Sequence, residues 1–199
     1  GVAATRTYRP KKHAVFRRCM GDRVEAKASR FTGLTNRRDK HGAASVINRD
    51  DRYGEQLVKR LGDATPVVTY GLAQRADFRA SNYRTEFGGT SFQLDARGRS
   101  YLVRLPLIGR FNVSNALAAL AAATSLGINL RDAVLSLSKA QQVPGRLQAV
   151  PGQSQVQICV EYERTDDEHH NSVKNLRALH PQQPRRVVGP GRRPHQRTH

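Results

Sequence analysis

The hydrophobic positions predict a strand, a helix and a second strand between residues 42 and 71. The segment GAASVINRDD (42–51) is a short apolar run that ends in an asparagine and paired acids, which is typical of a strand closing on a turn. YGEQLVKRLG (53–62) has the spacing of a helix that ends at Gly62, and PVVTYG (66–71) resumes as a strand. This alternation indicates an α/β domain.

A period of two replaces the helical spacing between residues 76 and 107. Polar and apolar residues alternate there, with turn residues at Gly88-Gly89 and in the segment Asp95 to Gly98. We predict antiparallel hairpins, inserted into an α/β sheet whose strand order the sequence does not define.

Two helices are predicted over residues 112–140. The first runs from Asn112 to Leu126 and ends at Gly127, and the second is capped by Asn129 with Asp132 in its first turn. The residues predicted to form the packed faces are Leu117, Leu120, Ala121 and Thr124 in the first helix and Leu130, Val134 and Leu137 in the second.

Composition shifts at both ends of the chain. QVPGRLQAVPGQ (142–153) carries two prolines and two glycines, which indicates a domain boundary, and VQICVEY (156–162) after it predicts a buried strand. The tail from about residue 181 has almost nothing to bury and is predicted to be disordered. In the apolar-poor N-terminal part, a short helix is predicted over residues 22–31.

The strongly positive net charge of the chain makes anionic molecules candidate partners. The formal net charge is +18, and residues 1–60 hold 16 Lys and Arg against 6 Asp and Glu. Such an excess attracts the phosphates of nucleic acids, anionic lipids or nucleotides, or it forms a solvated, arginine-rich surface. No apolar run approaches the roughly 20 residues that span a bilayer. The two cysteines have no metal-like spacing, so a reduced, cytoplasmic setting is expected.

The start of the first predicted helix carries two asparagines three residues apart. Asn112 is placed to cap the helix, and Asn115 lies one turn further along the same face. A carboxamide offers both a donor and an acceptor, which reading the edge of a purine requires. Helix capping and ligand binding therefore both remain open for this pair.

Several segments resemble the Mur ligases, the ATP-dependent amide-forming enzymes of peptidoglycan synthesis. GRFNVSNALAAL (109–120) resembles their G-x-[FH]-N-x-x-N-x-L-A-A segment, and VPGRL (143–147) resembles V-x-G-R-x. VEYERTD (160–166) stands where the tripeptide-forming branch has V-D-Y-A-H-T-P. SVINRDDRYG (45–54) and EAKASRF (25–31) resemble that branch's A-V-[IL]-N-x-D-D-x-x-G and A-K-x-x-[LI]-F segments.

The resemblance implies two groups of site residues. Lys27 matches a lysine that is carbamylated in the family to bind magnesium, and His13 stands at the distance of a metal-binding histidine; the alternative is that both are exposed surface residues. Asn112 and Asn115 would contact adenine. Arg146 would reach the ribose or phosphates, or serve as a solvated linker residue, and Glu161 replaces a nucleotide-binding aspartate by a side chain one methylene longer.

The resemblance also implies a fold and a function. We expect the latter part of a central ATP-binding domain over residues 1–146 and the start of a Rossmann-like C-terminal domain over residues 147–199. The expected activity adds diaminopimelate or lysine to UDP-N-acetylmuramoyl-L-alanyl-D-glutamate with ATP and Mg²⁺, in the cytoplasm and as a monomer.

The phosphate-binding loop limits what this chain is expected to do. The sequence contains no G-T-[NK]-G-K-[ST] loop, so we expect an internal piece of such a ligase that is inactive alone. The alternatives are a basic nucleic-acid-binding protein and a non-catalytic remnant. Only 6% of residues are aromatic and no stacking motif is present, which disfavours nucleic acid as the partner.

Overall fold

The computed structural model describes residues 2–4, 44–64, 66–72, 75–150, 157–162, 166–177 and 179. The helix predicted over residues 22–31 and the tail from residue 181 lie outside these residues. None of the described helices is long and apolar enough to cross a membrane.

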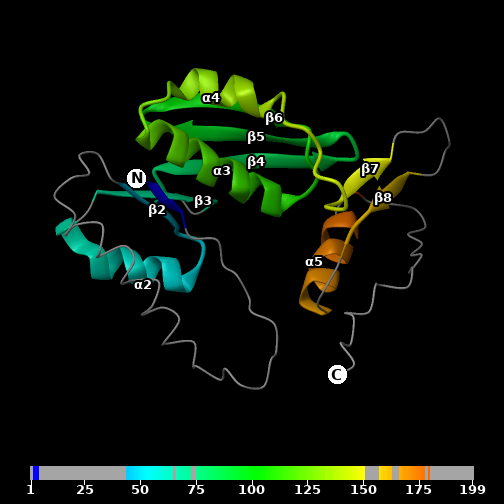
Figure 1. The fold of residues 1–199 in the computed structure, drawn as a ribbon, viewed down its shortest axis with the longest axis horizontal. Coiled ribbons are helices and arrows are strands. Elements are labelled where there is room, and N and C mark those ends of the chain that lie inside the picture. Colours follow the sequence, from blue (N-terminus) through cyan, green and yellow to red (C-terminus); the bar gives the residue numbers. More distant parts are fainter. Residues whose placement is uncertain are drawn as a thin grey trace, which may run out of the picture.

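A six-stranded mixed sheet forms the centre of the fold, and its strands lie in chain order (Figure 1). They are β1 (Val2–Ala4), β2 (Ala44–Asn48), β3 (Val67–Gly71), β4 (Phe78–Glu86), β5 (Gly89–Ala96) and β6 (Arg99–Leu105). The pairs β1–β2, β2–β3 and β3–β4 are parallel, whereas β4–β5 and β5–β6 are antiparallel. The α/β class and the hairpins are therefore confirmed.

The hairpins are not a separate insertion, which corrects the sequence-based prediction. β4 pairs in parallel with the end of β3, through Tyr70 opposite Phe78 and Gly71 opposite Arg79, so the hairpins continue the main sheet. Because only these two residue pairs join β3 to β4, most of the hairpin length projects past the end of β3. The alternating pattern indicates strands but cannot indicate which strand they join.

Helices cover both faces of the sheet. α2 (Arg52–Leu61), followed by the short η1 (Gly62–Ala64), packs Leu57 and Leu61 against Ile47 on one face. α3 (Arg110–Ser125) and α4 (Leu130–Leu137) lie on the other, where Val46 joins the larger core. Neighbouring residues of β2 thus point to opposite helical layers, as the pleat of a strand requires.

The paired acids after β2 join this strand to its neighbours. The Asp51 carboxylate accepts a hydrogen bond from the Tyr53 N–H at 2.8 Å and caps α2. Both oxygens of Asp50 accept from the Leu72 N–H, at 3.0 and 2.9 Å, which ties the end of β2 to the end of β3. One acid therefore starts the helix and the other fixes the strand ends.

Helices α3 and α4 follow the sequence prediction closely. All four residues predicted for the packed face of α3 are buried. The helix ends in a Schellman arrangement, in which the Gly127 N–H donates to the Thr124 carbonyl and the Ile128 N–H to the Ala123 carbonyl. The Asn129 side chain caps α4 by accepting from the Arg131 N–H at 2.9 Å, as predicted.

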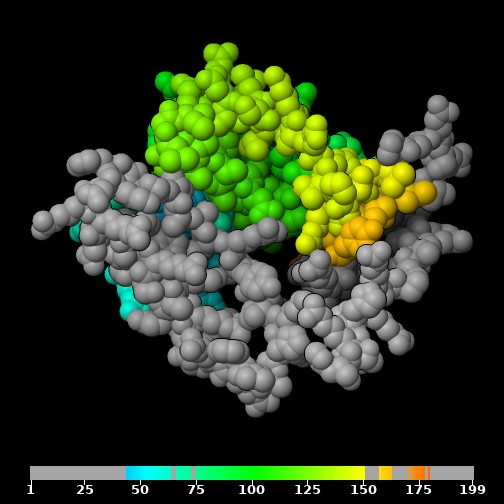
Figure 2. Space-filling view, in the orientation of Figure 1, coloured from blue at the N-terminus to red at the C-terminus, as the bar shows by residue number. Residues whose placement is uncertain are grey.

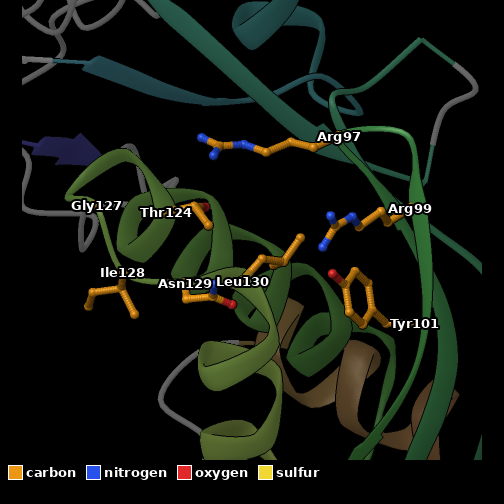
Figure 3. Close-up of a pocket in the computed structure, with 8 residues that line it drawn as sticks. All are labelled: Arg97, Arg99, Tyr101, Thr124, Gly127, Ile128, Asn129 and Leu130. Carbon is orange, nitrogen blue, oxygen red and sulfur yellow. The ribbon is translucent and has the colours of Figure 1, made fainter.

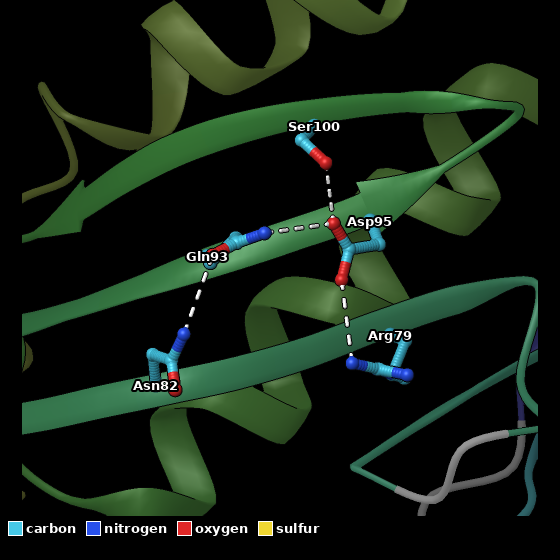
Figure 4. Close-up of polar contacts among 5 residues, drawn as sticks. All are labelled: Arg79, Asn82, Gln93, Asp95 and Ser100. Atoms are coloured by element: carbon cyan, nitrogen blue, oxygen red, sulfur yellow. Dashed lines mark hydrogen bonds and ion pairs between the residues drawn. The ribbon is translucent and has the colours of Figure 1, made fainter.

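A polar network ties the three antiparallel strands together on the face away from α3 (Figure 4). The Asp95 carboxylate accepts hydrogen bonds from Ser100 at 2.5 Å and Gln93 at 3.1 Å and forms an ion pair with Arg79 at 3.6 Å. The hydrogen bond from Ser100, then that from Gln93, lowers the pKa of Asp95 below its ordinary value. These contacts therefore join β4, β5 and β6 to one another on the face of the sheet opposite the helices α3 and α4.

A smaller unit follows the linker after α4. β7 (Gln148–Val150) and β8 (Ile158–Val160) form an antiparallel pair, and α5 (Asp166–Arg177) comes next. The strand predicted here is confirmed as β8, but its predicted burial is wrong, because Ile158 is 52% and Val160 38% exposed. A run of apolar residues predicts burial only where another layer covers it, and within the described residues this pair has just two strands.

Tyr70 gives the fold an expected sensitivity to alkaline pH. Burial, followed by the negative charges of Asp50 and Asp51, raises the pKa of Tyr70 above its ordinary value. The unfolded chain then releases this proton at lower pH than the folded chain does, so stability is lost as pH rises above about 10. We expect Tyr70→Phe to reduce that loss, by up to about 1.4 kcal/mol at pH 11.

Urea unfolding of both proteins between pH 8 and 11 measures the effect. Subtracting the Tyr70→Phe curve from the wild-type curve removes the contribution of the other tyrosines. Parallel decline of the two stabilities above pH 10 would show that Tyr70 ionises equally in both states.

Candidate functional site

Gly109, not Asn112, caps the start of α3. Gly109 has φ +102° and makes no side-chain capping bond. Its N–H donates to the Thr90 hydroxyl at 3.2 Å, and that hydroxyl donates to the Leu107 carbonyl at 2.9 Å. The interpretation of Asn112 as a helix cap is therefore wrong: the motif glycine occupies that position, and β5 holds it through Thr90.

Asn112 is an internal brace in the first turn of α3. It is only 8% exposed, and its Nδ2 donates to the Ile108 carbonyl at 2.9 Å. Its Oδ1 accepts from the Nδ2 of Asn115 at 3.4 Å. Asn112 therefore secures the entry into the helix and orients the asparagine one turn further on.

Asn115 presents its carboxamide to solvent. Its side chain is exposed, and within the described part of the chain its Oδ1 accepts no hydrogen bond. One Nδ2 hydrogen points back to Asn112, which leaves an acceptor and a second donor side by side. This pair of groups matches the donor and acceptor on a purine edge.

Two further residues lie beside the start of α3. Phe111 is 38% exposed, and Asn175 of α5 comes so close that a Cβ built on Gly109 would lie 3.3 Å from its Cγ. Neither residue was among the site residues predicted from the sequence. Phe111 was visible as an aromatic residue within the motif, whereas only the fold brings Asn175, 66 positions after Gly109, to this place.

The linker after α4 is held in a fixed shape by Glu161. Its Oε2 accepts from the Leu147 N–H at 2.5 Å, and its Oε1 lies 3.7 Å from an Arg146 guanidinium nitrogen. The Tyr162 N–H also donates to the Gly145 carbonyl at 2.8 Å. The Glu161 side chain is 14% exposed and that of Arg146 is 47% exposed, so the carboxylate positions the linker while the guanidinium remains accessible.

These elements gather at one end of the sheet. In Figure 1 the beginning of α3, the β7–β8 pair and α5 lie together at the end of the sheet away from α2. Figure 2 shows the atoms of β7, β8 and α5 (yellow to orange) against the green body of the sheet and α3. The fold thus places the start of α3, which carries Asn112 and Asn115, at the same end of the sheet as the β7–β8 pair and α5.

Lys27 and His13 lie outside the described residues. Within the residues that are described, no group of three or more His, Cys, Asp or Glu side chains is placed to hold a metal ion. The magnesium site therefore stays a prediction from the motif. Among the described residues, the carboxamide of Asn115 has the chemistry to bind adenine, and the guanidinium of Arg146 has the chemistry to bind the anionic oxygens of a nucleotide.

Comparison with known proteins defines the class. Residues 11–123 match the family model described as the Mur ligase middle domain. The chain is 36% identical over 166 residues to the UDP-N-acetylmuramoyl-L-alanyl-D-glutamate--2,6-diaminopimelate ligase of Lactiplantibacillus plantarum, covering 82% of this chain and 33% of the relative. The ligase of the same name from Geobacillus kaustophilus is 34% identical over 180 residues, covering 90% and 36%. The chain belongs to the Mur ligase family.

Solved structures agree with this assignment. A UDP-N-acetylmuramoyl-L-alanyl-D-glutamate--2,6-diaminopimelate ligase matches 84% of this chain and 34% of its own with a TM-score of 0.67 and 28% identity. The Acinetobacter baumannii UDP-N-acetylmuramoylalanyl-D-glutamyl-2,6-diaminopimelate--D-alanyl-D-alanyl ligase matches 78% and 33% with a TM-score of 0.66; at 24% identity it supports the fold alone. The chain spans about a third of the length of the curated relatives it matches.

Proposed function

We propose that this chain is part of an ATP-dependent ligase that adds diaminopimelate to UDP-N-acetylmuramoyl-L-alanyl-D-glutamate, and that the start of α3 binds the adenine. The observation that carries the proposal is the exposed carboxamide of Asn115, oriented by the buried Asn112. Diaminopimelate is favoured over lysine because the relatives at 34–36% identity are named as diaminopimelate ligases.

Each described residue has a separate role in this proposal. Asn115 donates to a ring nitrogen of adenine and accepts from its exocyclic amine. Phe111, exposed one turn before it, offers an aromatic face to the base. Arg146 binds ribose or phosphate oxygens through its accessible guanidinium, and Glu161 is a positioning residue that holds the linker behind it.

The remaining roles rest on residues outside the described part. Lys27, as a carbamate, and His13 would hold Mg²⁺, which neutralises phosphate charge. ATP supplies the phosphoryl group that activates the dipeptide carboxylate. The domain division proposed at residues 146 and 147 falls in the linker held by Glu161, between α4 and β7.

A segment exchange tests the proposal. Residues 75–150 of this chain replace the matching segment of the Lactiplantibacillus plantarum ligase, and ATP-dependent incorporation of labelled diaminopimelate is measured. We expect the exchange to retain ligation and Asn115→Ala within it to lower kcat/KM for ATP at least about tenfold, as expected for a lost bidentate base contact. Gly88→Ala is the control, because a Cβ at Gly88 meets nothing within 4 Å.

Two results would contradict the proposal. One is a folded exchange protein that binds the dipeptide substrate but forms no product at any ATP concentration. The other is an Asn115→Ala variant of it with unchanged kcat/KM for ATP.

A further inference from the structure

An open groove lies at the opposite end of α3 from Asn115. Its volume is about 410 Å³. One wall comes from the β5–β6 turn and the start of β6, and the other from the corner between α3 and α4 (Figure 3). Its lining residues are Arg97, Arg99, Tyr101, Thr124, Gly127, Ile128, Asn129 and Leu130. Because Thr124 and Asn115 are nine residues apart on one helix, the groove is separate from the proposed adenine site.

Two arginines extend into this groove from the strand wall. Arg97 and Gly98 form the two-residue turn between β5 and β6, with φ of +52° and +72°. Arg99 then begins β6 on the face that also carries Tyr101 and the buried Val103. In Figure 3 both side chains extend toward the corner between α3 and α4. The turn and the strand pleat therefore bring two positive charges to one side of the groove.

The described residues that line the groove supply no carboxylate to balance these charges, because none of them is acidic. The ion pairs found among the described residues join Arg79 to Asp95 and Arg146 to Glu161, and they leave Arg97 and Arg99 unpaired within that part of the chain. Two guanidinium groups on one wall repel each other, and a bound anion removes that repulsion.

The opposite wall adds polar and apolar surface. Thr124 is buried with its hydroxyl donating to the Leu120 carbonyl, and Asn129 caps the first turn of α4. Leu130 is buried beneath the groove, and Tyr101 is half-buried beside it. The groove thus combines a positively charged wall with polar and apolar surface opposite, and its volume lies within the range of small-molecule sites.

We propose that this groove binds a small anion that carries at least two phosphate or carboxylate charges. Arg97 and Arg99 hold the anionic groups through paired N–H donors, and Tyr101 and Leu130 contact the body of the ligand. This function is independent of the proposed ligase activity and of adenine binding.

Titration with inorganic pyrophosphate and, separately, with citrate tests the proposal and distinguishes phosphate from carboxylate ligands. Arginine side-chain and backbone resonances are followed by ¹H–¹⁵N NMR at constant ionic strength. We expect saturable shifts at residues 97–101 and 127–130 with at least one probe, and a loss of affinity of at least about tenfold in Arg97→Gln/Arg99→Gln, as for two lost charge-assisted contacts.

The matched control is Arg84→Gln/Arg104→Gln. Both of these arginines lie opposite Ser91 on the neighbouring strands β4 and β6, outside the groove lining, and their substitution changes net charge equally. We expect this control to keep affinity within about twofold of wild type, since distant exposed charges are largely screened.

Three outcomes would overturn the proposal: shifts that do not saturate with either probe, equal loss of affinity in both double variants, or shifts outside the groove. Far-UV circular dichroism checks folding. Should the double variant unfold, Arg99→Gln alone is measured, with a loss of at least about threefold expected. Asn115→Ala should leave anion binding unchanged, which separates this test from that of the adenine site.

Discussion

Replacing Gly54 with alanine is expected to lower the free energy of unfolding by at least about 3 kcal/mol, close to the whole stability of a marginal domain. A Cβ at Gly54 would lie 1.8 Å from the carbonyl oxygen of Asn48 and 3.4 Å from the Cγ2 of Ile47. The obstructing atom belongs to the backbone at the end of β2, whose paired neighbours prevent it from moving aside.

The helix propensity of alanine opposes this effect but is smaller. Within α2 an alanine is favoured over glycine by about 1 kcal/mol. To relieve the clash, α2 must move away from β2, which separates Leu57 and Leu61 from Ile47. Losing these buried contacts costs more than the propensity gains.

Urea unfolding followed by circular dichroism measures the change. Gly88→Ala is the matched control, because no atom lies within 4 Å of its Cβ position; its stability should stay within about 0.5 kcal/mol of wild type. A Gly54→Ala protein as stable as the control would show that α2 does not pack against β2 in this way.

Replacing Asn115 with alanine is expected to weaken adenosine binding by about 1–3 kcal/mol, or roughly fivefold to 150-fold, without unfolding the protein. The side chain is exposed and braces no other element, so its loss removes the donor and acceptor for the base and little else. Asn112→Ala should differ, because Asn112 is buried and bonded to Ile108; it should lower both stability and adenosine affinity.

Asn129→Ser is the control for Asn115→Ala. Asn129 also stands at a helix start, and serine can keep its capping bond to the Arg131 N–H. It lies beyond the far end of α3, so adenosine affinity should not change. Equal affinity losses in the two variants would indicate a general effect on the helices rather than a lost base contact.

Local patterns in the sequence predicted the helical part of the fold well. The Gly127 termination of α3 and the Asn129 cap of α4 depend on residues within one or two turns, so the sequence displays them directly. The burial of the face containing Leu117 and Leu120 follows in the same way from the spacing of apolar residues.

The errors concern features that depend on the assembled molecule. The alternating pattern of β4 to β6 does not indicate that β4 pairs with β3. The apolar residues of β8 likewise do not indicate whether another layer of the protein covers them. Asn112 has the ideal residue type for a cap, yet Gly109 takes that position because Thr90, 19 positions earlier, holds it. Long-range contacts decide these points.

Because long-range contacts also shape the candidate site, the sequence predicted only some of its features. The motifs identified Asn115 and Arg146, but only the structure separates the buried brace Asn112 from the exposed Asn115. The engagement of Glu161 with the Leu147 amide requires the linker to fold back on β8, which no local pattern encodes.

Titration of the chain with adenosine, observed through its backbone amide resonances and the side-chain carboxamide resonances of its asparagines, tests the central claim most directly. Adenosine carries no phosphate, so the measurement depends neither on a phosphate-binding loop nor on the arginine groove. We predict a saturable shift of the Asn115 carboxamide, with smaller shifts at Asn112 and Phe111 and none at residues 97–101. Saturable binding that leaves residues 109–115 unshifted, or no saturable binding, would contradict the assignment of the α3 start as the adenine site.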